Sequence, residues 1–345
     1  MPYLPLLQSM SRRNNFRDCF IPSVLLCPLL LVQAGLAAAQ FKPVAPSTAP
    51  SSGNQTRNPP PPIASGQPPT TFSVGVNLVH ILATVRNQDG AVITNLNRAD
   101  FQLTDDGVTQ NIAVFERNTS LPLSVAVLID TSASTRVDIH YEEESVLKFI
   151  PALLNAGNSS DAFALYSFNW RTNLEADFSR SQRRAEHALR SLKGEGGTSL
   201  YDAIYLASDN LAGREGRHVI VVVTDGNDTT SYKRFGDALK AAQRAEIVLY
   251  PIVAVPIEND AGREVGGEHA LAALAAATGG RIFYPAGFAQ LNEAFIDIIK
   301  ELRTQYLLGF YPTGVTQTPG AFHPVTVTVK KQDLKVMSRS GYYEP

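Results

Sequence analysis

Three short segments of this 345-residue sequence carry oxygen-bearing side chains at spacings that suit a hard cation. The first segment places Asp130, Ser132 and Ser134 at alternate positions, directly after the apolar run 123–129. Carboxylate and hydroxyl oxygens are ligands that Mg²⁺ and Mn²⁺ accept, and alternate positions on one turn can converge on a single ion. The same residues also suit a helix N-terminus after a strand, where Asp and Ser cap free backbone N–H groups. On this segment alone, both interpretations stay open.

Two later segments add a hydroxyl and a second carboxylate. The glycine-rich stretch Gly194-Glu-Gly-Gly-Thr198 delivers Thr198 just before a helical pattern begins at Tyr201. A second apolar run, 219–223, ends in Thr224-Asp225-Gly226. Near-continuous apolar runs of this length are typical of strands that are buried on both faces. Loops at the carboxyl ends of such strands are where open α/β sheets place their ligands, so we expect the segments to meet at one sheet edge.

The set Asp-x-Ser-x-Ser, Gly-Gly-Thr and Thr-Asp-Gly, in that order, resembles the metal-ion-dependent adhesion site of von Willebrand factor type A domains. The resemblance covers roughly residues 120 to 300. It implies that Mg²⁺ or Mn²⁺ is the cofactor and that the partner is a protein presenting an Asp or Glu carboxylate as a further ligand. The metal ligands that it implies are Asp130, Ser132, Ser134, Thr198 and Asp225. It implies direct binding by the two serines, and binding directly or through water by the other three.

Residues around these loops are candidates for choosing the partner. The turn after Phe168 contains Trp170 and Arg171, and in a sheet of this topology it lies at the same edge as the metal loops. Trp and Arg are the residue types most often found at binding hot spots. The acidic loop 256–268, which contains Glu258, is expected there too. Trp170 could equally cap the sheet edge, and the loop could simply be solvated.

Between residues 120 and 303 the sequence alternates strand and helix patterns. Helices are predicted over residues 140–154, 181–192, 201–211, 232–245, 268–277 and 291–303. Besides the two buried strands, further strands are predicted over residues 161–168, 174–178, 247–255 and 281–284. This alternation is typical of the α/β class, here a doubly wound, mostly parallel, Rossmann-like sheet with right-handed crossovers.

Residues 72–119 read as short strands bounded by Asp-Gly turns, and residues 304–345 read as further short strands. A sheet as small as either flank is barely stable alone. We therefore predict that the two flanks fold together as one β-sandwich, with the α/β domain inserted between them. Two separate β appendages are the alternative. This layout looks like that of a secreted bacterial subfamily, the VWFA-related proteins.

The amino terminus has the pattern of an export signal. Basic residues precede the apolar run 21–36, which ends in small residues before Gln40, so residues 1–39 are predicted to be a signal peptide. Residues 40–71 are rich in Pro and Ser and are predicted to be a disordered linker. The mature chain would be periplasmic or extracellular and without a transmembrane segment. Both cysteines, Cys19 and Cys27, would leave with the signal peptide.

Other function classes find little support in the sequence. With 18% charged residues and a net charge of −2, nothing favours nucleic acid. Ser132 stands where aspartate-nucleophile phosphatases have their second acid, and the six histidines show no zinc-ligand spacing. We predict a non-enzymatic, cation-dependent protein-binding module for adhesion or scaffolding, of open oligomeric state. The alternatives are a structural envelope protein with a stabilising or vestigial metal site, and a hydrolase.

Overall fold

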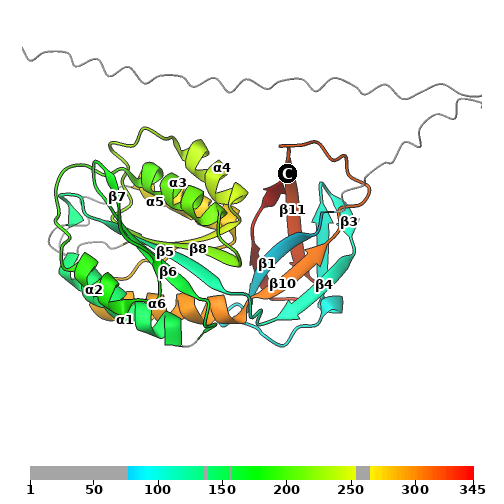
Figure 1. Ribbon diagram of the computed structural model, residues 1–345. Helices are drawn as coiled ribbons and strands as arrows, with labels where there is room; N and C mark the ends of the chain where they lie inside the picture. The colour runs from blue at the N-terminus through cyan, green and yellow to red at the C-terminus, as the bar shows by residue number, and fades with distance from the viewer. Residues whose placement is uncertain (1–76, 136–138, 156, 254–264) are drawn as a thin grey trace, which may run out of the picture. The chain divides into compact units, whose positions relative to one another are not determined.

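A computed structural model describes residues 77–345, apart from residues 136–138, 156 and 254–264. The predicted signal peptide and linker lie outside these residues, as does Glu258. The described strands form a five-stranded sheet and two four-stranded sheets (Figure 1). None of the helices in the described part of the chain has the length and apolar character needed to cross a membrane.

The five-stranded sheet is mostly parallel and has the order β7-β6-β5-β8-β9. The parallel strands are β5 (Leu123–Asp130), β6 (Ala162–Phe168), β8 (Arg217–Thr224) and β9 (Ile247–Val253). At one edge, β7 (Thr172–Ser179) pairs antiparallel with β6. Every residue of β5 is buried, and alternate side chains enter the two hydrophobic clusters on either side of the sheet. This explains the unbroken apolar run that predicted the strand.

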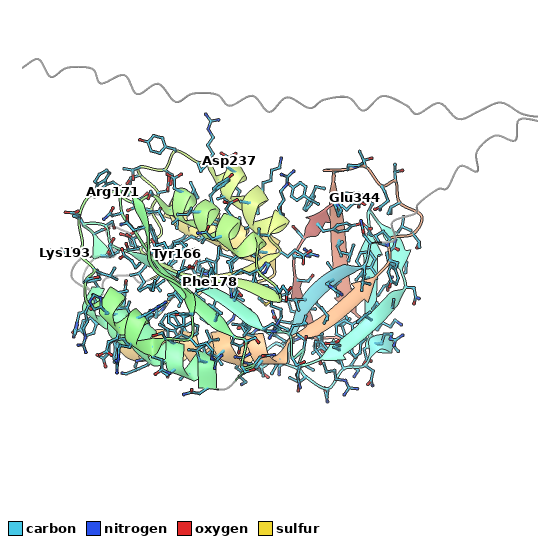
Figure 2. All side chains as sticks on the ribbon, in the orientation of Figure 1. Tyr166, Arg171, Phe178, Lys193, Asp237 and Glu344 are labelled. Atoms are coloured by element: carbon cyan, nitrogen blue, oxygen red, sulfur yellow. The ribbon has the colours of Figure 1, made fainter. Side chains whose placement is uncertain are left out.

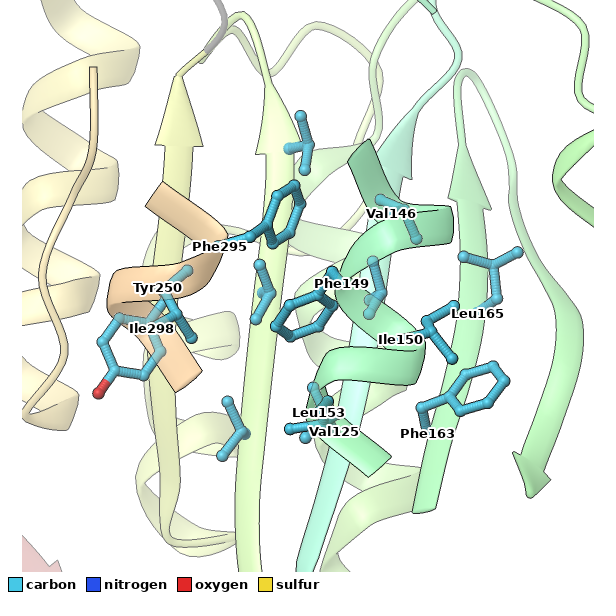
Figure 3. Packing of buried hydrophobic residues seen from close by; sticks show 14 of the residues in the cluster. Val125, Val146, Phe149, Ile150, Leu153, Phe163, Leu165, Tyr250, Phe295 and Ile298 are labelled. Atoms are coloured by element: carbon cyan, nitrogen blue, oxygen red, sulfur yellow. The ribbon is translucent and has the colours of Figure 1, made fainter. Parts of the chain in front are cut away.

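Within the described residues, six helices cover the sheet on both faces. One face is covered by α1 (Ile139–Asn155), α2 (Gln182–Leu189) and α6 (Phe288–Thr304), and the other by α3 (Leu200–Ala212), α4 (Phe235–Arg244) and α5 (Val265–Thr278) (Figure 1). Figure 3 shows α1 and α6 packed on the sheet, where the rings of Phe149 and Phe295 lie 4.8 Å apart. Burying each such side chain contributes about 1.5–3 kcal/mol, so the two clusters stabilise the layered arrangement.

Several predicted elements differ in extent from those observed, and two of these differences have a clear local cause. The strand predicted over residues 281–284 is reduced to one parallel bridge between Ile252 and Phe283. Pro285 follows two residues later and has no N–H to continue a ladder. The helix predicted from residue 232 begins at Phe235, because the side chain of Asp237 accepts a hydrogen bond from the backbone N–H of Arg234 and fixes the helix start there.

The segments before and after the α/β domain build two antiparallel sheets together. The first sheet, in the order β12-β1-β10-β4, contains β12 (Lys335–Ser338), β1 (Val79–Arg86), β10 (Tyr306–Phe310) and β4 (Ile112–Arg117). The second, in the order β13-β11-β2-β3, contains β13 (Gly341–Tyr343), β11 (Phe322–Val329), β2 (Phe101–Asp105) and β3 (Val108–Gln110), and a short 3-10 helix (Arg98–Asp100) precedes β2. Each sheet pairs early strands with late ones, as in β1 with β10 and β2 with β11.

The inner faces of these two sheets share one hydrophobic cluster, to which both flanks contribute. In β11, Val325 and Val327 point into this cluster while Thr326 and Thr328 are exposed, which is the alternation expected of a strand with one buried face. The predicted fold class, a mostly parallel α/β sheet with a small β-sandwich around it, is confirmed. The residue boundaries of the domains stay a prediction.

The hairpin between β2 and β3 is closed by a two-residue turn. Asp106 has φ of 48° and Gly107 has φ of 79°, and two positive φ values characterise the type I′ turn that suits twisted hairpins. Glycine adopts this conformation without strain, and aspartate tolerates it better than most residues. The turn leaves the Asp106 side chain half-exposed beside the end of β2.

The sandwich and the α/β domain meet where the chain passes between them. Thr119 N donates to Gln305 O at 3.5 Å, next to the start of β5 and the end of α6. Glu301 on α6 is buried and forms ion pairs with Arg86 of β1 and with Arg281. The junction therefore lies at the amino end of β5, opposite the end that carries Asp130.

Candidate metal centre

The loop that follows β5 gathers a carboxylate and two hydroxyls. Asp130 ends the strand and is fully buried. Its Oδ1 accepts a hydrogen bond from Ser132 N at 2.8 Å, and its Oδ2 accepts one from Thr224 Oγ1 at 2.6 Å. The hydroxyl oxygens of Ser132 and Ser134 lie 3.0 Å apart. These side chains thus form one polar group at the carboxyl ends of β5 and β8.

Backbone hydrogen bonds bring the glycine-rich turn onto this loop. Glu195 N donates to Thr131 O at 2.8 Å, and Ala133 N donates to Gly196 O at 3.1 Å. Thr198 is buried, and its carbonyl oxygen accepts from Thr229 N at 2.9 Å in the loop that follows Asp225. The three segments singled out in the sequence therefore lie against one another, while the ligand set itself stays a prediction.

The glycines of the turn are needed for this approach. Gly196 has φ of +74°, and a Cβ atom there would lie 2.5 Å from Cδ1 of Trp170. A Cβ at Gly197 would lie 2.7 Å from Cγ2 of Thr230. Real Cβ atoms do not come this close to other heavy atoms, so only glycine lets the turn pass between Trp170 and the loop after Asp225.

The electrostatics of the site favour a bound cation. Burial raises the pKa of Asp130 to about 6, and the nearby charge of Asp225 raises it further. The hydrogen bonds from Thr224 and Ser132 lower this pKa but do not offset the rise. Neither aspartate forms an ion pair with Lys, Arg or His in the described part of the chain. Two close carboxylates without a protein cation are costly to ionise. A divalent ion bound by both would remove that cost, and the adjacent hydroxyls suit Mg²⁺ or Mn²⁺.

The family model for the von Willebrand factor type A domain matches residues 124–296, which is half of the chain. The chain belongs to the von Willebrand factor type A domain family. The matched residues begin in β5 and end in α6, so they span the five-stranded sheet together with the three loops of the candidate centre.

Solved structures with similar folds include domains of bacterial surface proteins. The von Willebrand factor domain of the type V pili tip protein Mfa5 from Porphyromonas gingivalis is 14% identical, with a TM-score of 0.45, over 53% of this chain and 95% of that one. The PilB minor pilin from Streptococcus sanguinis is 14% identical, with a TM-score of 0.43, over 54% of this chain and 62% of that one. A search of curated protein sequences finds no match.

The turn after β6 lies beside the loops of the type A domain. Ser199 N donates to Asn169 O at 2.6 Å, which ties this turn to the segment that carries Thr198. Trp170 is 48% exposed, and the Arg171 guanidinium lies 4.0 Å from the centre of its ring. Figure 2 labels Arg171 and Lys193 at the same end of the domain. Trp170 both packs over Gly196 and presents a free face, so the geometry fits a capping role and a binding role.

The site contains contacts that the sequence did not reveal. The hydroxyl of Thr224 orients Asp130 by a hydrogen bond. The only sequence signal for this contact is the place of Thr224 in the Thr-Asp-Gly triplet. The Oδ1 of Asp228 accepts a hydrogen bond from Tyr201 N at 3.2 Å, in the first turn of helix α3, which precedes Asp228 in the chain. Glu268, at the start of α5, is buried beside Gly226. These contacts hold the loop after Asp225 against α3 and α5.

Proposed function

We propose that the von Willebrand factor type A domain of this chain is a divalent-cation-dependent protein-binding module that serves adhesion or scaffolding. Mg²⁺ or Mn²⁺ would be held by the side chains of Asp130, Ser132, Ser134, Thr198 and Asp225. When bound, the ion supplies a positive centre on which an Asp or Glu side chain of a partner protein can bind as a further ligand. Trp170 and Arg171 would then contact the partner beside that carboxylate.

The observation that carries this proposal is a pair of carboxylates at one sheet edge that no Lys, Arg or His of the described residues neutralises. Asp130 is buried, and Asp225 lies close enough to raise its pKa. Ser134 and Asp225 are less buried than Asp130, so the polar group opens toward solvent on one side. A cation held there would be accessible to an outside carboxylate, and the low local dielectric would strengthen that contact.

We propose recognition rather than catalysis for this site. The hydroxyls nearest Asp130 are engaged in holding the loops. Thr131 Oγ1 donates to Phe168 O at 3.2 Å, and Thr135 Oγ1 donates to Asp130 O at 2.9 Å. Ser132 and Ser134 bond to each other, and no serine of this loop is paired with an imidazole among the described residues. An activated serine would need such a base.

Calorimetry of Mg²⁺ binding to the full chain tests the metal site. The wild type should bind one ion, and Asp130→Asn should lose that binding. Asp209→Asn is the matched control, because Asp209 is an exposed aspartate on α3 of the same domain. Absence of Mg²⁺ and Mn²⁺ binding by the wild type contradicts the proposal.

Partner binding needs its own measurement. Capture of envelope proteins by the immobilised chain should require Mg²⁺, stop with EDTA and fail with Asp130→Asn. Ion binding without cation-dependent capture would support the alternative of a structural envelope protein with a stabilising metal.

The chain is further proposed to act outside the cytoplasm, in the periplasm or beyond. This rests on the predicted signal peptide, which gives a mature chain that begins at Gln40. Mass spectrometry of the protein recovered from the host should find that amino terminus. A protein recovered with residues 1–39 intact would contradict export by cleavage.

A further inference from the structure

A second group of metal-ligand side chains lies in the β-sandwich. Asp105 ends β2, Asp106 begins the turn that follows, and His323 lies on β11. One carboxylate oxygen of each aspartate and one ring nitrogen of the histidine all lie within 4.8 Å of one another. His323 Nδ1 is 3.0 Å from Asp106 Oδ2 and 3.7 Å from Asp105 Oδ1.

The strand register places these residues together. β2 and β11 pair antiparallel, with Asp105 opposite Val325, and Asp106 N donates to Pro324 O at 2.9 Å. On the other side of β11, His323 lies opposite Tyr342 of β13. The pairing of β2 with β11 therefore fixes the positions of Asp105 and His323, and β13 places Tyr342 beside His323. The type I′ turn adds Asp106 from the solvent-exposed side.

Several buried polar atoms of this group make no hydrogen bond to the described residues. His323 is 2% exposed, and neither ring nitrogen makes a hydrogen bond of acceptable geometry, although Nδ1 lies 3.0 Å from Asp106 Oδ2. Asp105 is fully buried, and its Oδ1 has no hydrogen bond, whereas its Oδ2 accepts one from Tyr342 Oη at 3.0 Å. An unsatisfied buried polar group costs about 1–3 kcal/mol, and more when charged. A cation between the two carboxylates and Nδ1 would satisfy the facing atoms together.

We propose that Asp105, Asp106 and His323 form a second metal site, which binds a divalent transition metal of the Zn²⁺ type. Imidazole is a good ligand for Zn²⁺, whereas Mg²⁺ prefers oxygen ligands alone. Ligands of a tetrahedral zinc lie about 2.1 Å from the ion and hence about 3.4 Å from one another. The two distances from Nδ1, 3.0 and 3.7 Å, lie on either side of that value. The half-exposed side of Asp106 leaves a fourth position to water.

Two neighbours of the group suit a structural site. The Tyr342 hydroxyl fixes the second oxygen of Asp105, as outer partners of metal ligands do, and the Tyr342 ring stacks on His323 with the ring centres 5.1 Å apart. Both cysteines of the sequence precede residue 28, so no disulfide can cross-link the sandwich. An ion joining β2 to β11, with β13 behind it, would stabilise this set of short strands.

Titration of the chelator-treated full chain with Co²⁺, followed by Zn²⁺ competition, tests the site. The wild type should show the visible absorption of tetrahedral Co²⁺, and Zn²⁺ should displace it at one ion per chain. Asp106→Asn should lower the Zn²⁺ affinity more than about 100-fold, because losing even an outer partner of a metal site costs about 10–100-fold. Asparagine followed by Gly107 is favoured in a type I′ turn, so this variant keeps the hairpin.

The matched control is Asp333→Asn, because Asp333 is an exposed aspartate of the same sandwich with a positive φ of 64°. It should bind Zn²⁺ as the wild type does, and so should Asp130→Asn in the type A domain. His323→Asn should lose binding as Asp106→Asn does. A wild type without the Co²⁺ spectrum, or variants at 106 and 323 with unchanged Zn²⁺ affinity, would overturn the proposal. The group would then be a metal-free contact of the histidine with the two aspartates.

Discussion

The two oxygen-rich groups of this chain differ in what carries them. The group at the edge of the parallel sheet stands on three loops that backbone hydrogen bonds join, and its proposed donors are carboxylates and hydroxyls. The group in the sandwich stands on paired strands and one tight turn, and it includes an imidazole. Loops can adjust when a ligand arrives, whereas a strand residue can move only if ladder hydrogen bonds break. The first group suits an exchangeable ligand, and the second suits a permanent one.

The largest expected effect comes from Asp130→Asn, which replaces one carboxylate oxygen with an amide nitrogen and should affect only one of the two sites. Asp130→Asn should weaken Mg²⁺ binding by more than about 100-fold, by the same ligand-loss argument, and leave Zn²⁺ binding unchanged. It should also raise the unfolding temperature of the metal-free protein at neutral pH, because it removes a buried charge next to Asp225. Calorimetry with each ion and thermal unfolding in EDTA measure both effects. A parallel loss of Zn²⁺ affinity would mean that the groups are coupled.

Tyr342→Phe should have the converse selectivity: it should weaken metal binding in the sandwich and leave the site in the type A domain unchanged. Without the hydroxyl, Asp105 Oδ2 loses its hydrogen bond inside the core. We expect Zn²⁺ affinity to fall about 10–100-fold while Mg²⁺ binding is unchanged. Competition with a coloured chelator measures the first and calorimetry the second. Tyr343→Phe, at the neighbouring and less buried position, is the control and should change neither affinity.

The pH dependence should sharpen the contrast at the loop-borne site. Because the pKa of Asp130 is raised to about 6, its carboxyl holds a proton below that pH, and Mg²⁺ must displace it. Mg²⁺ affinity should therefore fall by about tenfold for each pH unit below 6. In the metal-free protein, the stability of the folded state changes with pH in the opposite sense to the Mg²⁺ affinity. A folded-state pKa above the unfolded value of 3.8 contributes stability at low pH that is lost as pH rises through about 6.

Unfolding temperatures in EDTA between pH 4 and 7, for the wild type and Asp130→Asn, isolate this contribution. The difference between the two proteins should grow across that interval and stay constant above it. A difference independent of pH would show that Asp130 ionises in the folded protein as it does in the unfolded chain.

The smallest expected effect tests whether loop geometry alone tunes the first site. Gly196→Ala places a side chain at φ of +74° and 2.5 Å from Trp170, so the turn must shift. We expect a loss of about 1–3 kcal/mol in the free energy of unfolding and a Mg²⁺ affinity only several-fold lower, because no ligand is removed. Denaturant unfolding measures the first and calorimetry the second. Gly213→Ala, with open space around it, should change neither. Full-strength Mg²⁺ binding by the Gly196 variant would contradict a tightly held turn.

Local pattern was enough to predict the layers of the fold and the meeting of the loops. The apolar run 123–129 predicted a strand with two buried faces because burial itself requires that composition. The alternation of buried and exposed residues in β11 follows from the same rule, because this strand buries only one face. The strand predicted over 281–284 was too long. The apolar residues there suggested a strand, but Pro285 has no backbone N–H with which to continue the hydrogen-bond ladder.

The group in the sandwich was missed because its members are far apart in the chain. The histidines looked scattered when only local spacing was considered, and His323 meets Asp105 and Asp106 solely through the register of β2 with β11. Register depends on how two distant segments pair, which a single sequence does not display. Asp228 illustrates the same limit on a smaller scale, since it caps a helix that precedes it in the chain.

The side-by-side entry of the chain into the sandwich has a mechanical consequence. Tyr306, the first residue of β10, is paired with Arg117, the last residue of β4, so the two connections to the inserted domain arrive on neighbouring strands. A pull on the inserted domain would therefore load two paired strands together: β4 at the sheet edge, and β10, which also pairs with β1 on its other side.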